Sequence, residues 1–121
     1  MIAASNVLTG LVAALHVYFL VLEMFLWATP YGARTFQRPL AEMQQSRSLA
    51  ANQGLYNGFL AAGLVASYVV APDVAYFARL FFLACVIVAG VFGAATAARR
   101  ILFVQALPAA AALVVTVLAA R

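Results

Sequence analysis

The sequence predicts an all-α integral membrane protein, built as an antiparallel bundle of four transmembrane helices. Two observations support this fold class. Of the 121 residues, 68% are hydrophobic and only 8% are charged, whereas about a quarter of the residues in a soluble domain are charged. The apolar residues also form four runs, each long enough to cross a bilayer, which takes about 20 residues. A chain of this length is expected to fold as a single domain over residues 1–121.

Each apolar run is bounded by residues that interrupt an apolar helix. The expected spans are residues 6–29, 50–71, 74–97 and 101–120. The interruptions are Pro30 with Tyr31 and Gly32, then Pro72 with Asp73, and finally Arg99 with Arg100. Because the last two connections are only two or three residues long, neighbouring spans should run antiparallel.

The one long connection, residues 31–49, contains apolar side chains at helical spacing, namely Phe36, Leu40 and Met43. This pattern predicts a short amphipathic helix on the membrane surface, interrupted near Pro39. A plain solvated loop is an equally good interpretation of the same residues.

The placement of arginine predicts the orientation in the membrane. The chain has no lysine, and five arginines lie in the first and third connections: Arg34, Arg38, Arg47, Arg99 and Arg100. The second connection region has Asp73 and Arg79, and the C-terminus has Arg121. Positively charged short loops stay in the cytoplasm, so both termini should face outward from a bacterial inner membrane. The arginines form no continuous basic tract, which argues against nucleic-acid binding.

Five polar residues fall within or near the expected hydrocarbon region, where such groups are costly and usually face the bundle interior. They are His16, Glu23, Gln53, Asn57 and Gln105. His16 and Glu23 are seven residues apart, which places them on nearly the same helix face, two turns and roughly 10 Å from each other. Gln53 and Asn57 are four apart and are expected to share a face of the second span.

These polar residues are also expected at similar depths. With a rise of 1.5 Å per residue, Glu23, Asn57 and Gln105 lie about 9, 5 and 7 Å to the cytoplasmic side of their span centres, and Gln53 about 11 Å. The sequence therefore predicts one polar layer, in which the Glu23 carboxyl has amide partners from two other helices and the His16 imidazole lies one layer deeper.

A carboxyl held in such a layer can donate or accept a proton at neutral pH. We therefore predict Glu23, His16 and Asn57 as catalytic residues. The predicted substrate-binding residues are Gln53, Tyr56, Gln105 and Trp27. Two simpler interpretations remain, because amides also serve as interhelical hydrogen-bond partners and a lone histidine is often a neutral core residue. The ligand set is inadequate for a metal, and no nucleotide, haem or flavin motif is present, so no cofactor is expected.

Small residues and one proline indicate how the helices pack. Gly54 and Gly58 form a GxxxG pattern and Gly90 with Gly93 forms a small face, both of which permit close helix contact. Packing within the bundle accounts for these glycines, and a homodimer seam is the alternative. Pro108 predicts a kink beside Gln105.

Two stretches carry a resemblance to a known family. The strings HVYFLVLEMFLW, residues 16–27, and AANQGLYNGF, residues 50–59, combine intramembrane polar residues with fixed spacing. They resemble the bacterial membrane-protein family called domain of unknown function 1304, and the resemblance runs along the whole chain. It implies a small membrane fold of four spans and implies no activity.

Three functions fit these residues. The first is a cofactor-independent enzyme, such as an isomerase, a cyclase or an epoxide-opening enzyme, that uses Glu23 on a lipophilic small molecule inside the lipid bilayer. The second is a proton-coupled transporter, which in so small a bundle would need a dimer to form a pathway. The architecture is similar to that of small multidrug-resistance transporters, although their aromatic pattern is missing. The third is a scaffold subunit in which Glu23→Gln would be nearly silent.

Overall fold

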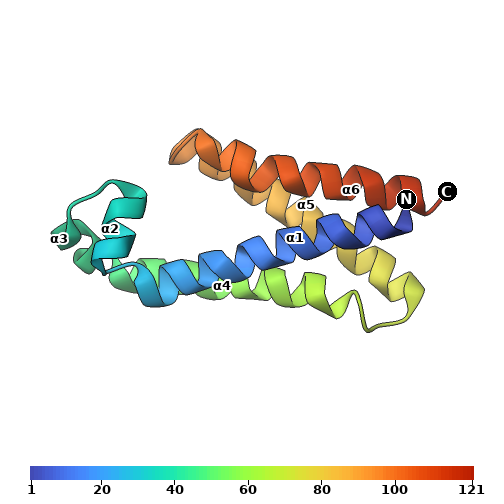
Figure 1. Cartoon of the computed structure of the whole chain (residues 1–121), viewed down its shortest axis with the longest axis horizontal. Helices are drawn as coiled ribbons and strands as arrows, with labels where there is room; N and C mark the ends of the chain where they lie inside the picture. The colour runs from blue at the N-terminus through green and yellow to red at the C-terminus, as the bar shows by residue number, and fades with distance from the viewer. The chain divides into compact units, whose positions relative to one another are not determined.

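A computed structural model describes all residues, 1–121, and contains helices and turns but no strand (Figure 1). The order is α1 (Ile2–Val21), η1 (Leu22–Leu26), α2 (Pro30–Phe36), α3 (Leu40–Gln45), α4 (Arg47–Ala66), α5 (Pro72–Thr96), η2 (Leu102–Ala106) and α6 (Leu107–Ala119), where η marks a π-helical turn. The all-α fold class is therefore confirmed.

The chain divides into two compact units, which are described separately. The terminal unit consists of Met1–Ala14 and Leu60–Arg121, and the central unit is Leu15–Phe59. Helices α1 and α4 each contribute residues to both units.

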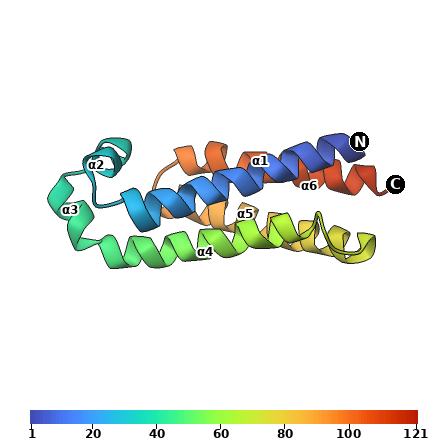
Figure 2. The same cartoon turned by 60° about the horizontal axis from the view of Figure 1, so that its bottom comes forward.

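The terminal unit is held together by an apolar core. Its buried residues are Val12, Ala13, Leu64, Leu83, Val86, Ala109 and Ala112. Helices α5 and α6 lie antiparallel and side by side in Figures 1 and 2. At Gly90 an added Cβ would lie 2.7 Å from the backbone nitrogen of Ala106, so the backbones of α5 and η2 touch there. The small face predicted on the third span is therefore used for packing within the chain.

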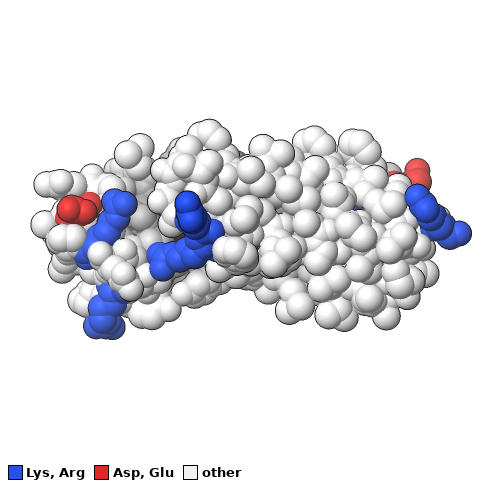
Figure 3. All heavy atoms as spheres, turned by 90° about the horizontal axis from the view of Figure 1, so that it is seen from above, with Lys and Arg blue, Asp and Glu red and all other residues white.

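Three helical stretches are long and apolar enough to cross a membrane: Ile2–Leu26, Pro72–Thr96 and Leu102–Ala119. They identify the chain as a membrane protein. Helix α4 does not meet the same criterion, because its first half carries polar residues such as Asn52, Gln53 and Asn57. The fourth span consequently stays a prediction. Figure 3 shows a face covered mostly by uncharged residues, with the arginine and acidic side chains in small groups.

Two proline positions differ from the sequence expectation. Pro72 was expected to separate two spans, but it lies in the first turn of α5, and the connection before it runs over residues 67–71. Pro30 likewise begins α2, where the Thr29 hydroxyl accepts a hydrogen bond from the Gly32 amide at 3.3 Å. The physical reason is that proline lacks an N–H and has a fixed φ, both of which suit the first position of a helix. The expectation of a two- or three-residue connection before α5 was wrong.

The segment after η1 is helical in two short pieces. Helix α2 ends at Gln37, which adopts a left-handed φ of 54°, and α3 begins after Pro39. Met43 on α3 is completely buried. Figure 2 shows α3 leading directly into α4.

Both π-helical turns contain a residue of the predicted polar layer. Glu23 lies in η1 and Gln105 lies in η2. The second turn has a clear cause, because Pro108 cannot donate to the carbonyl of Val104 and its ring would clash with that carbonyl in a regular α-helix. The structure places a wider turn where the sequence predicted a kink. Single π turns inside α-helices are frequent at functional sites.

Candidate functional site

The Glu23 carboxyl is buried in the central unit with one of its two oxygens paired. The residue is 9% exposed. Its Oε1 accepts a hydrogen bond from Asn57 Nδ2 at 3.1 Å. Its Oε2 is buried and has no hydrogen-bond partner. Buried polar atoms are nearly always satisfied in proteins, and an exception indicates strain, catalysis or a missing ligand.

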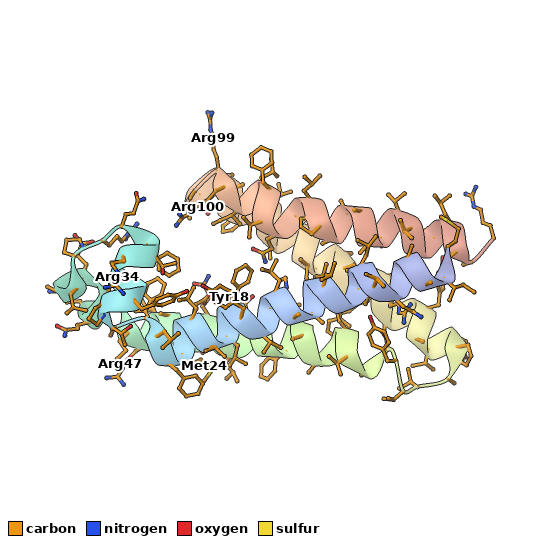
Figure 4. The ribbon with its side chains drawn as sticks, in the orientation of Figure 1. Tyr18, Met24, Arg34, Arg47, Arg99 and Arg100 are labelled. Atoms are coloured by element: carbon orange, nitrogen blue, oxygen red, sulfur yellow. The ribbon has the colours of Figure 1, made fainter.

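Two glycines on α4 make the Glu23–Asn57 contact possible. A Cβ added at Gly54 would lie 2.8 Å from Met24 Cγ and 3.0 Å from Glu23 Cβ, and one added at Gly58 would lie 2.6 Å from Leu20 Cδ1. Met24 is labelled near the end of α1 in Figure 4. The helices can approach this closely only because neither glycine has a side chain. The GxxxG pattern therefore serves contact within the chain and carries Asn57 to the carboxyl.

The buried face of α1 is unusually polar. Ser5, Thr9, His16 and Glu23 are all buried, at intervals of four, seven and seven residues that keep them on one helix face. His16 is completely buried, and its ring contacts Phe19 edge to face at a centroid distance of 5.4 Å. The sequence prediction that His16 and Glu23 are buried on the same helix is therefore confirmed, while their roles in catalysis stay predictions.

Two other predicted site residues, Gln53 and Tyr56, lie on the exposed side of α4. On α4 the side chain of Gln53 is exposed. Tyr56 is 56% exposed, and its ring packs against that of Phe59 at a centroid distance of 6.0 Å. Gln105 belongs to the terminal unit, so its contact with Glu23 stays a prediction. Within the central unit, one of the two predicted amides on α4 reaches the carboxyl.

Trp27 has partners that give it a structural role. Its Nε1 donates a hydrogen bond to Ser46 Oγ at 2.9 Å, and its ring lies 4.6 Å from that of Phe36. It therefore ties the segment containing α2 and α3 to the end of η1. A small hollow of about 100 Å³ lies beside it, lined by residues including Met24, Thr29 and Arg47. Binding of substrate by Trp27 stays a prediction.

A second polar cluster, in the terminal unit, was not expected. The sequence counts Arg79 among the charges near the second connection, inside the expected span 74–97, and the structure places it within α5, two turns after Pro72. Its Nε donates to Ser67 Oγ at 3.0 Å and its Nη1 donates to Ser5 Oγ at 3.3 Å. The signal that could have revealed it is a single arginine seven residues beyond a helix-starting proline.

Similarity to known proteins extends over most of the chain. A family model described as "Protein of unknown function (DUF1304)" matches residues 10–117. The chain is also similar to "Uncharacterized protein YpaA" of Lactococcus lactis subsp. lactis (strain IL1403), with 29% identity over 101 residues that cover 82% of this chain and 84% of the relative. No solved structure matches the chain significantly.

Proposed function

We propose that this chain, which belongs to the DUF1304 family of proteins of unknown function, is a membrane-embedded acid–base enzyme acting on a lipophilic small molecule without a cofactor. Glu23 is the proton donor or acceptor, and Asn57 fixes its orientation. His16, on the same face of α1, handles the second proton. Gln53 and Tyr56 have no role in this proposal, because both side chains are exposed.

The proposal depends on the unpaired Oε2 of Glu23. If the carboxyl served only to join α1 and α4, an amide or hydroxyl would do so at lower cost, and both polar atoms would be expected to have partners. Instead Asn57 holds one oxygen and leaves the other buried and without a protein partner. A polar atom of a substrate is the partner that such an oxygen lacks.

The chemistry that this arrangement supports needs only proton transfer. In an isomerisation, the Glu23 carboxylate removes a proton from one position of the substrate and the resulting acid returns it at another, so the enzyme ends unchanged. In a cyclisation, the Glu23 acid protonates an alkene, the carbocation forms the ring bond with a second double bond, and the neutral His16 imidazole takes the proton that the ring cation releases. In an epoxide opening, the Glu23 acid protonates the epoxide oxygen, the C–O bond breaks as water adds to the carbon, and His16 takes the extra proton of that water. Return of the proton from His16 to Glu23 restores both side chains.

We further propose that α4 is a fourth span, with both termini outside a bacterial inner membrane. The support is the number of membrane crossings between the arginine-rich segments, which must be even if both segments lie on the same side. Arg34 and Arg38 precede α4 and Arg47 is its first residue, whereas Arg99 and Arg100 follow α5. Both groups can lie in the cytoplasm, as positive charge favours, only if α4 and α5 both cross. Helix α4 has 20 residues, which span about 30 Å.

The test compares Glu23→Gln with wild type in isolated membranes offered a panel of lipophilic alkenes, epoxides and ketones. Glu42→Gln is the matched control, because Glu42 is an exposed carboxyl on α3. We expect wild type and Glu42→Gln to convert a substrate and the folded Glu23→Gln protein to convert none. Vesicles with an imposed pH gradient give the second readout. If the vesicles show a flux that requires Glu23 and the membranes convert no substrate, the protein is a transporter. If Glu23→Gln changes neither the flux nor the conversion, the protein is a scaffold.

A further inference from the structure

The terminal unit contains a hollow that the proposed reaction does not use. Its volume is about 330 Å³, within the range of pockets that hold small ligands, about 300 to 1,000 Å³. It lies at the end of the unit where the chain termini are found, between the starts of α1 and α5 and the end of α6. Its walls combine apolar residues such as Ile2 and Ala75 with the polar groups of Ser5, Thr116 and Arg79.

Arg79 supplies a positive charge that no carboxylate neutralises. No ion pair is formed by this arginine, and it is half-buried on a helix that is otherwise strongly apolar. Two of its five N–H groups are donated to Ser67 and Ser5. A cation removed from water without a counter-charge is costly, so the site favours an anion.

The guanidinium is held in place by groups that leave it able to bind. Ser67 donates its own hydroxyl proton to the Leu64 carbonyl at 2.6 Å, so its oxygen is available to Arg79 as an acceptor. The Tyr68 ring lies under the guanidinium, 4.9 Å from Cζ. The Tyr68 hydroxyl donates a hydrogen bond to the Asn6 carbonyl, which fixes the ring in this position. Arg79 is therefore oriented before any ligand arrives.

Buried hydroxyls extend the polar side of the hollow. Ser5 Oγ lies 2.7 Å from Thr116 Oγ1, and the two residues are 2% and 4% exposed. Arg79 Nη1 donates to the same Ser5 oxygen. An ordered chain from guanidinium to two hydroxyls, beside apolar walls, is suited to a charged oxygen group attached to an apolar body.

We propose that this hollow binds the oxyanion group, carboxylate or phosphate, of a small amphiphile, with Arg79 as the charged ligand and the hydrogen-bonded Ser5–Thr116 pair as a hydroxyl donor. A guanidinium presents a planar fork of donors that matches both anions. The apolar walls receive the part of the tail nearest the head group. The source of the anion is either a membrane lipid or a free metabolite, and both have the same head-group chemistry.

The test measures binding to the purified full chain in neutral detergent, by titration calorimetry and by the rise in unfolding temperature that a ligand of the native state causes. The probes are dodecyl phosphate, dodecanoate and uncharged dodecanol, followed by inorganic phosphate. Wild type should bind both anionic amphiphiles and not dodecanol. Arg99→Gln is the matched control, since it removes an exposed arginine of the terminal unit beyond the far end of α5, and it should bind as wild type does.

Three variants make the proposal falsifiable. Arg79→Gln should weaken dodecyl phosphate binding about tenfold or more, and Arg79→Lys should give a smaller loss because it keeps the charge and loses the fork. Ala75→Leu should also weaken binding by filling the hollow without touching the hydrogen bonds of Arg79. This variant decides the matter if Arg79→Gln fails to fold. Failure of wild type to bind, or equal binding by Ala75→Leu and wild type, would overturn the proposal.

The same protein distinguishes the two sources. Competition by inorganic phosphate identifies a free anion as the ligand. Two results together identify a lipid. Phosphate fails to compete, and the unfolding temperature is higher in phosphatidylglycerol vesicles than in phosphatidylcholine vesicles. This difference in unfolding temperature is lost in Arg79→Gln. These measurements do not involve Glu23, so they stand or fall separately from the proposed enzyme.

Discussion

Glu23 in the central unit and Arg79 in the terminal unit are both charged side chains on mainly apolar helices, yet they are accommodated differently. Arg79 has two serine hydroxyls and a tyrosine ring around one guanidinium. Glu23 has a single amide on one of its oxygens. The difference follows from side-chain length, because a long arginine can reach partners on several helices, whereas a short glutamate needs the neighbouring backbone brought to it.

This contrast predicts that losing one hydrogen-bond partner of Glu23 lowers the stability of the protein more than losing one partner of Arg79 does. Three substitutions test this contrast, and each is measured as a change in thermal unfolding in detergent.

The largest effect is expected from Gly54→Ala. The new Cβ would lie 2.8 Å from Met24 Cγ and 3.2 Å from the Leu20 carbonyl oxygen, so α4 must move away from α1. We expect a loss of about 1–3 kcal/mol in the free energy of unfolding. The control is Gly10→Ala in the terminal unit, where the nearest atom is the Tyr68 hydroxyl at 3.2 Å. Equal stability of the two variants would show that the close approach at Gly54 is not needed.

A smaller effect is expected from Asn57→Ala, which leaves both oxygens of Glu23 without a protein donor. The expected loss is about 1 kcal/mol, the size of an interhelical hydrogen bond in a membrane protein. Asn52→Ala on the exposed side of the same helix is the control and should change stability little. Combining Asn57→Ala with Glu23→Gln should cost less than the sum of the single changes. Additive losses would argue that the two side chains do not interact.

The smallest effect is expected from Ser67→Ala, because Arg79 keeps its bond to Ser5 and its contact with the Tyr68 ring. We expect a loss of about 0.5 kcal/mol, close to that of the exposed control Ser48→Ala. A loss larger than that of Asn57→Ala would reverse the comparison, since it would make the arginine cluster the more fragile of the two.

Sequence patterns predicted part of the Glu23 site. An ionisable side chain in an apolar span is costly to expose to lipid, which indicated that Glu23 and His16 would be buried. The spacing of the glycines indicated a close helix contact on α4. The spacing of Gln53 and Asn57 was not sufficient to place both. Four residues leave a rotation of about 40° between two side chains, and the contact made by Gly54 turns Asn57 inward and Gln53 outward.

Other features could not be predicted from the residues alone. Proline suits both the end of one helix and the start of the next, so the residues alone did not show that Pro72 belongs to α5. The π turn at η1 contains no proline, so no sequence rule marked it. Helix α4 combines a polar first half with span length, and composition cannot decide whether such a helix crosses a membrane.

The π turn at η1 also constrains how the chain can vary in length. A π turn holds one more residue than an α turn over the same stretch, so deletion of Leu22 would restore regular winding and leave the helix beyond the turn in place. Glu23 would then move to the position that Leu22 holds, a rotation of about 100° that takes its carboxyl away from Asn57, whereas Trp27 would keep its bond to Ser46. Family members should therefore tolerate gaps at the break between α2 and α3 and retain the number of residues in the turn before Glu23.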